Sequence, residues 1–76
     1  MKVFFNKSIL YNNCFCINWP IGSRHRIEKS ENIKNLLKGI FGSIVIKDTN
    51  RNFHFNFIDK EDLSYFILWS SDGLEI

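Results

Sequence analysis

Three phenylalanines stand at alternate positions, Phe53, Phe55 and Phe57, with His54 and Asn56 between them. Successive side chains of a β-strand point to opposite faces of a sheet, so this segment predicts a strand with one aromatic and one polar face. Antiparallel sheets allow one face to be buried while the other is wet. The segment therefore predicts an antiparallel sheet whose phenylalanine face is covered by the rest of the chain.

The aromatic content suits the size of the chain. Its 76 residues include eight Phe, two Trp and two Tyr. A chain of that length buries only about 60% of the surface that it exposes when unfolded, so its core is thin and needs large side chains. We expect a single domain, residues 1–76, with most of its aromatic rings buried.

The N-terminal part of the chain predicts a hairpin. Residues 14–19 alternate between two faces, with the larger side chains on one of them, and the apolar clusters Val3–Phe5 and Ile9–Tyr11 precede this segment. Asn12 and Asn13 lie between, and Asn tolerates the left-handed conformation of a tight turn. We therefore expect Ile9–Tyr11 to pair with residues 14–19 across this turn.

Residues 30–42 predict a helix. Ser30 is a favourable N-cap and Glu31 suits the first turn, so the polar and basic stretch Ile21–Lys29 is expected to be a connection. Gly39 costs about 0.8–1 kcal/mol relative to Ala inside a helix, a cost that close approach of the helix to the sheet would explain. The apolar residues recur at helical spacing in one stripe: Ile33, Leu36, Leu37, Ile40 and Phe41.

A second helix is predicted over residues 60–70, with Asp59 as its N-cap. It is apolar nearly all round, which is typical of a helix buried on two sides or covered by a partner. Two groups of side chains are expected on it: Leu63, Phe66 and Ile67 toward the core, and Tyr65 and Trp69 as a neighbouring ridge.

Further strands are expected at residues 44–46 and, as a short final one, at 74–76. The predicted fold is α+β in the order ββαββα, an antiparallel sheet with two helices on its phenylalanine face. The alternative is a ferredoxin-like split βαβ fold in which Val3–Phe5 is an accessory segment and residues 74–76 form the last strand. The expected core comprises Phe15, Ile17, Leu36, Leu37, Ile40, Phe53, Phe55, Phe57, Leu63 and Phe66.

Four residues could hold a metal ion, namely Cys14, Cys16, His25 and His54. Zinc sites usually space paired cysteines by about two to four residues, and the single residue between these two strains a tetrahedral site. A secreted domain this small would usually carry several disulfides, so we interpret both cysteines as reduced thiols in a cytosol. The sequence predicts no metal and no cofactor.

Catalysis is not favoured either. A cysteine could pair with a histidine, but no local pattern supports such a pair. The neighbouring carboxylates Asp59, Glu61 and Asp62 are explained by capping of the second helix. A short chain leaves little volume for a substrate cleft, and we expect a protein that is not an enzyme.

A basic segment before and along the first helix is the main candidate for a binding surface. It could contact a phosphate backbone or an acidic protein surface, although charged residues on an exposed helix face are also ordinary. A net charge of +2 is small for strong phosphate binding, so the composition favours a protein partner over nucleic acid. The candidate partner-binding residues are Arg24, His25, Arg26, Lys29, Lys34 and Lys38, with the aromatic residues Tyr65 and Trp69.

Membrane association is not indicated. No apolar stretch approaches the roughly 18 residues of a membrane-spanning helix. The first residues lack the apolar segment and cleavage site of a signal peptide. We therefore expect a cytoplasmic protein with no membrane partner.

The stretch Phe55–Trp69 runs from a strand with alternating aromatic residues through an acidic turn into an amphipathic helix with Phe66, Leu68 and Trp69 near its end. In this it resembles small phage-encoded accessory proteins. The resemblance implies a protein of the host-cell cytoplasm that binds and blocks a host protein or protein–nucleic-acid complex, as anti-CRISPR and anti-restriction factors do. The alternative is a small nucleic-acid-binding protein that uses the basic loop and helix face. A homodimer would be another way to cover an apolar helix.

Overall fold

The helices and strands follow the predicted order. The computed structural model describes residues 2–19, 26–49 and 52–75, with Arg26 and Ile27 described by their backbone. Its elements are β1 (Lys2–Lys7), β2 (Phe15–Asn18), α1 (Arg26–Ile40), β3 (Ile44–Asp48), β4 (Phe53–Phe57), α2 (Lys60–Trp69) and β5 (Leu74–Glu75). The order ββαββα is confirmed, with β5 following as the short final strand.

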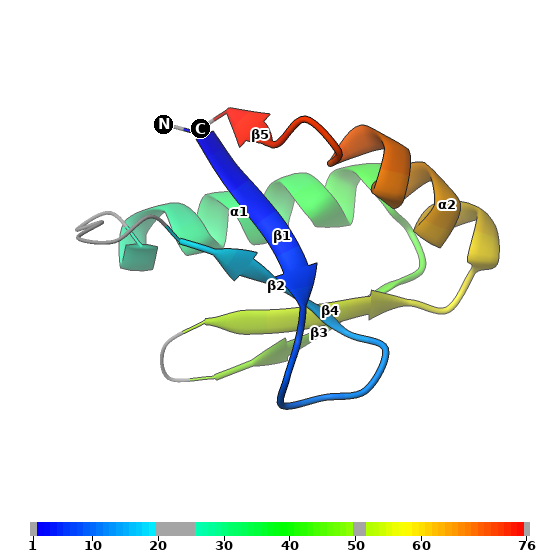
Figure 1. Ribbon diagram of the computed structural model, residues 1–76, viewed down its shortest axis with the longest axis horizontal. Coiled ribbons are helices and arrows are strands. Elements are labelled where there is room, and N and C mark those ends of the chain that lie inside the picture. The colour runs from blue at the N-terminus through cyan, green and yellow to red at the C-terminus, as the bar shows by residue number, and fades with distance from the viewer. Residues whose placement is uncertain (1, 20–25, 50–51, 76) are drawn as a thin grey trace.

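The strands form one antiparallel sheet in the order β3-β4-β2-β1-β5. Both helices lie on the same side of it (Figure 1). Phe55 of β4 lies opposite Phe15 of β2 and opposite Ile46 of β3, so large apolar side chains form a row across the sheet. β1 pairs with both β2 and β5, so the alternative in which Val3–Phe5 is an accessory segment is wrong.

The core lies between the helices and the phenylalanine face of the sheet. Phe53 and Phe55 are buried and Phe57 packs beside them, as the alternation predicts. Phe66 of α2 stands at the centre of this core. Its ring centroid lies between 5.1 and 6.3 Å from those of Phe5, Phe15, Phe41, Phe55, Phe57 and Trp69.

α1 begins earlier than predicted, at Arg26, so Ser30 lies inside the helix and is not its N-cap. Residues 26–29 are Arg, Ile, Glu and Lys, all of which a helix interior accepts, and the preference of Ser for the N-cap is too weak to stop the helix there. The predicted connection therefore contributes a first turn to α1.

The apolar stripe of α1 is only partly buried. Ile33, Leu37 and Phe41 are buried, but Leu36 is 41% exposed and Ile40 38% exposed, so their assignment to the core is wrong. At about 100° per residue, Leu36 and Ile40 lie roughly 100° and 60° to the same side of Leu37. One sheet contacts the middle of the stripe and leaves this flank uncovered.

The connection between β1 and β2 is a loop, so the predicted strand Ile9–Tyr11 does not form. The Ser8 hydroxyl accepts hydrogen bonds from the N–H groups of Leu10 and Tyr11, at 3.1 and 3.2 Å. Such local side-chain bonds compete with strand pairing. Asn13 does adopt the left-handed conformation that the turn requires, with φ of 61°.

α2 begins at the predicted residue, Lys60, and has the predicted N-cap, Asp59. The Asp59 side chain accepts a hydrogen bond from the Glu61 N–H at 3.1 Å. Asp62 accepts two more, from the N–H of Ser43 at 3.1 Å and from its hydroxyl at 2.6 Å. These carboxylates fix the start of α2 and tie it to the start of β3, which is a structural role.

Candidate binding surfaces

The predicted basic surface is described in part. Arg24 and His25 lie outside the described residues, and Arg26 is the first residue of α1. On α1, Lys29 is half-buried and Lys38 is exposed. The described side chains of the predicted basic surface are therefore the lysines of α1.

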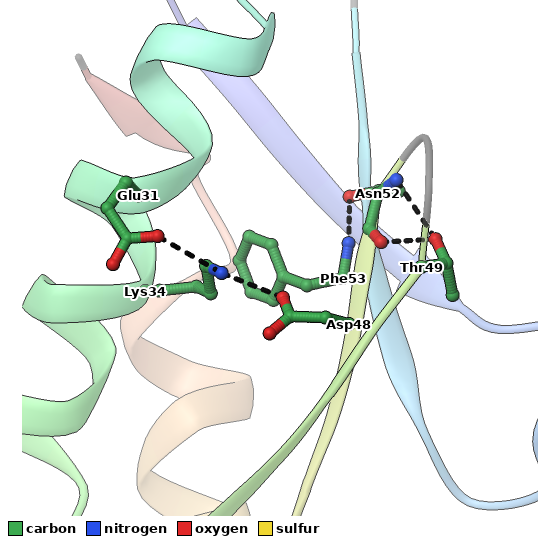
Figure 2. Close-up of polar contacts among 6 residues, drawn as sticks. All are labelled: Glu31, Lys34, Asp48, Thr49, Asn52 and Phe53. Carbon is green, nitrogen blue, oxygen red and sulfur yellow. Dashed lines mark hydrogen bonds and ion pairs between the residues drawn. The ribbon is translucent and has the colours of Figure 1, made fainter.

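Lys34 already has two partners. Its Nζ lies 2.7 Å from Oδ1 of Asp48 and 3.1 Å from Oε2 of Glu31 (Figure 2). The hydrogen bonds to Asp48 and then to Glu31 raise the pKa of Lys34 above its ordinary value. The side chain is only 14% exposed, and its ammonium also lies 5.9 Å from the ring centroid of Phe53. Two carboxylates thus neutralise this charge, which leaves little of it for a phosphate.

The other two lysines of α1 point in opposite directions. Lys29 and Lys38 are separated by about 180° around the helix axis, at about 100° per residue. Lys38 follows Lys34 by one turn and shares its side of the helix, toward β3. The three described lysines therefore do not form one basic face.

α2 has an apolar outer side. Leu68 is 77% exposed, Tyr65 56% and Ile67 54%. Because Phe66 faces the core, Leu68 lies about 160° away from the core direction and Ile67 about 100° away. The prediction that Ile67 faces the core is therefore wrong, and the exposed side chains run across the outer half of the helix.

The predicted ridge of Tyr65 and Trp69 packs against the residue that follows α1. The ring centroid of Phe41 lies 5.6 Å from that of Tyr65 and 5.7 Å from that of Trp69. Trp69 is half-buried and packs on the core, whereas Tyr65 is more than half exposed. The ridge is thus part of the fold at Trp69 and accessible at Tyr65.

A cleft of about 570 Å³ lies between α2 and the β1–β2 loop. Leu63 and Ile67 of α2 contribute one wall. The other lining residues are Lys7, Ser8, Asn12, Asn13, Cys14, Phe15, Asn56 and Phe57. Sequence reasoning missed this cleft, because no local pattern indicates that the loop and the helix lie beside each other.

The polar face of the sheet is covered at His54, contrary to the prediction of a wet face. The ring of Tyr11, from the β1–β2 loop, packs edge-to-face against that of His54, with centroids 5.1 Å apart and planes inclined by 69°. Nζ of Lys47 lies 4.7 Å from the centroid of the Tyr11 ring. His54 is 5% exposed, and among the described residues its Nδ1 has no hydrogen-bond partner. The register places Cys16 and Lys47 opposite His54 on the two neighbouring strands.

The Cys16 thiol on this face is not activated as a nucleophile. Cys14 and Cys16 are free thiols, and burial raises the pKa of Cys16, whose Sγ donates to Oδ1 of Asn6 at 3.2 Å. A thiol that stays protonated is a poor nucleophile. Within residues 2–19, 26–49 and 52–75, no three His, Cys, Asp or Glu side chains converge on a common point where a metal ion could bind, and His25 lies outside these ranges.

Comparisons of the chain with protein-family models, with curated proteins and with solved structures gave no match. Among the described helices, none is both long and apolar enough to cross a membrane. An inference of function therefore depends on the surface chemistry of the outer side of α2, the cleft and the sheet.

Proposed function

We propose that the protein acts by binding another protein through the outer side of α2, defined by Tyr65, Ile67 and Leu68. The observation that carries this is their exposure, between 54% and 77%, on one helix of ten residues. Ile58, just before the helix, is 79% exposed as well. Several large apolar side chains exposed on one short helix are typical of an interaction site, and Tyr is frequent among the residues that dominate binding energy.

Inhibition of a host nucleic-acid-handling complex is the specific form of binding that we propose. Its support is the resemblance of Phe55–Trp69 to small phage-encoded accessory proteins, a segment that includes all of α2. A protein of this size can block a partner by covering a surface, which needs no catalytic cleft. The proposed activity is therefore a steric block of the anti-CRISPR or anti-restriction kind, in the host cytoplasm.

The variant Leu68→Ser tests this proposal. Leu68 is 77% exposed, so the substitution removes apolar contact surface without opening the core. Tagged wild-type protein is expected to capture a partner from a nuclease-treated lysate of the cells in which it acts, and Leu68→Ser is expected to lose it. Circular dichroism and thermal unfolding check that the variant is folded, and Lys60→Ser on the same helix is the control.

Capture of the same partner by wild type, Leu68→Ser and Lys60→Ser alike would show that the outer side of α2 is not the contact surface. A partner that is lost on nuclease treatment would favour the nucleic-acid-binding alternative. That alternative is also tested by a gel-shift titration at about 50 and 200 mM salt, because phosphate contacts weaken steeply with salt. The pairing of Lys34 and the opposite directions of Lys29 and Lys38 give it less support than α2 gives to protein binding.

A further inference from the structure

β3 is the longer open edge of the sheet. In the described part of the chain it pairs with β4 alone, while β5 at the other edge has two residues. An edge strand presents backbone N–H and C=O groups to which another extended chain can bond. Which of these groups are free on β3 follows from its register with β4.

Two backbone hydrogen bonds, one at each end of the β3–β4 hairpin, show which residue pairs of this register are hydrogen-bonded. The Ile58 N–H donates to the carbonyl of Ser43 at 3.2 Å, and the Thr49 N–H donates to the carbonyl of Asn52 at 2.8 Å. Hydrogen-bonded and non-hydrogen-bonded pairs alternate along an antiparallel ladder. The odd-numbered residues of β3 therefore bond to β4, and the backbone groups of the even-numbered residues point away from it.

Those even-numbered residues are Ile44, Ile46 and Asp48. The Ile44 N–H is used, since it donates to the carbonyl of Phe41 at 3.3 Å. The Ile44 carbonyl, both backbone groups of Ile46 and the Asp48 N–H have no partner among the described residues. They form a short alternating row of acceptors and donors, as an added strand requires.

Lysines flank the middle of this edge on both faces of the sheet. Lys34 contacts Asp48 at the end of β3 (Figure 2), and Phe41 bonds to the first residue of β3, so the last turns of α1 run antiparallel above the strand. Lys38 lies between these two contacts, on the side of Lys34, and is therefore placed alongside Ile46. It is exposed and has no partner among the described residues. Lys47, next to Ile46 in the strand, shares the other face with His54, and its exposed side chain also contacts the Tyr11 ring.

We propose that the β3 edge binds an extended acidic segment of a partner protein as an added strand, a proposal that rests on the protein-binding function above. The flanking charges favour this occupant over a second copy of the chain. Twofold pairing of β3 with itself about Ile46 would place Lys47 opposite Val45 of the other copy and diagonal to its Lys47, on one face, and would bring the two Lys38 side chains toward each other on the other. Such nearby like charges are unfavourable. Acidic side chains of a partner strand would instead meet Lys38 on the helix side and Lys47 on the other.

Amide hydrogen exchange measured by NMR tests whether the edge is free. The N–H groups of Ile46 and Asp48 are expected to exchange faster than those of Val45 and Lys47, which bond to β4. Equal protection of all four amides in the isolated monomer would mean that the edge is already covered, and would overturn the proposal.

Binding is tested with a fluorescein-labelled peptide of about eight residues in which Glu and Val alternate, and with a matched peptide that carries Lys in place of Glu. The acidic peptide is expected to bind saturably by fluorescence anisotropy and to slow exchange at Ile46 and Asp48, and the basic peptide is expected not to bind. Lys38→Glu should weaken binding by roughly fivefold or more. Lys60→Glu, the same change of charge on α2, should leave it unchanged.

Beyond equal protection in the monomer, four results would overturn the proposal: no binding of the acidic peptide, binding without slower exchange at Ile46 and Asp48, equal effects of Lys38→Glu and Lys60→Glu, or protection of these amides in a dimer without peptide. The two proposals can fail separately. If the edge experiments fail while Leu68→Ser still abolishes capture of the partner, binding through α2 stands and strand addition does not. If Leu68→Ser captures the partner normally while the peptide results are as expected, strand addition at the β3 edge is supported and binding through α2 is contradicted.

Discussion

Phe66 is the side chain on which most of the aromatic core converges, since six other rings surround it. Phe66→Ala is expected to lower the free energy of unfolding by about 3–5 kcal/mol, because it leaves a cavity that rigid neighbours cannot fill. That is a large share of the stability of a small domain. Urea unfolding followed by tryptophan fluorescence measures the change. Phe4→Ala, at a side chain that is 47% exposed, is the control and should cost far less. Equal losses for the two variants would contradict this description of the core.

Among the described residues, Lys34 and Cys16 hold their protons more tightly in the folded chain than in the unfolded one. Hydrogen bonds to Asp48 and Glu31 raise the pKa of Lys34 from its ordinary value of 10.5, and burial raises the pKa of Cys16 from 9.0. A group whose pKa is higher in the folded chain than in the unfolded chain stabilises the fold at pH values below its unfolded pKa. This stabilisation is lost as the pH rises through its folded pKa.

The free energy of unfolding should therefore be level through neutral pH and decrease above about pH 9, when unfolded thiols begin to ionise. Urea midpoints measured at a series of alkaline pH values test this. In Cys16→Ser the first part of the decrease should disappear, which leaves the part that begins near 10.5, where Lys34 titrates in the unfolded chain. Stability that increased with alkaline pH would contradict the direction of both pKa shifts.

At the scale of the elements, α1 contains an uncompensated glycine. A Cβ built at Gly39 meets nothing within 4 Å. The prediction that a close approach of the helix to the sheet requires glycine here is therefore wrong. Gly39→Ala is therefore expected to stabilise the protein by about 0.8–1 kcal/mol through the helix propensity of Ala alone. Thermal unfolding should show a midpoint higher by several degrees. An unchanged or lower midpoint would mean that the position has a constraint other than helix propensity.

At the scale of the whole molecule, the two ends of the chain are joined by β1 and β5. These two strands lie side by side (Figure 1). In their short ladder Lys2 lies opposite Glu75 and Val3 opposite Leu74. The chain enters β5 through Gly73, whose φ of 82° is in the left-handed region that favours glycine.

Gly73→Ala is expected to destabilise the protein by about 1–3 kcal/mol, opposite in sign to Gly39→Ala. The added Cβ would be strained at this φ and would lie 2.9 Å from Cγ of Lys2 and from Cε1 of Phe4. Thermal unfolding of the two alanine variants in the same buffer makes the comparison. A midpoint for Gly73→Ala at or above that of the wild type would show that β5 contributes little to stability.

The features that the sequence predicts correctly are those with a local physical cause. The alternation of Phe53, Phe55 and Phe57 encodes a strand with one buried face, because the pleat repeats every two residues. The start of α2 follows from Asp59, whose carboxylate bonds to a nearby backbone N–H. These signals are enough to place most elements and to derive the order ββαββα.

What the tertiary structure alone decided depends on residues that are distant in the chain. Tyr11 covers His54, Asp48 forms an ion pair with Lys34, and the sheet contacts only the middle of the apolar stripe of α1, which leaves Leu36 exposed. Helical spacing and charge count say which side chains share a face, but not which neighbour, if any, will be packed against that face. The candidate binding surfaces belong to this second group: the exposed side of α2 and the open edge of β3 are defined by the contacts that the rest of the fold leaves unmade.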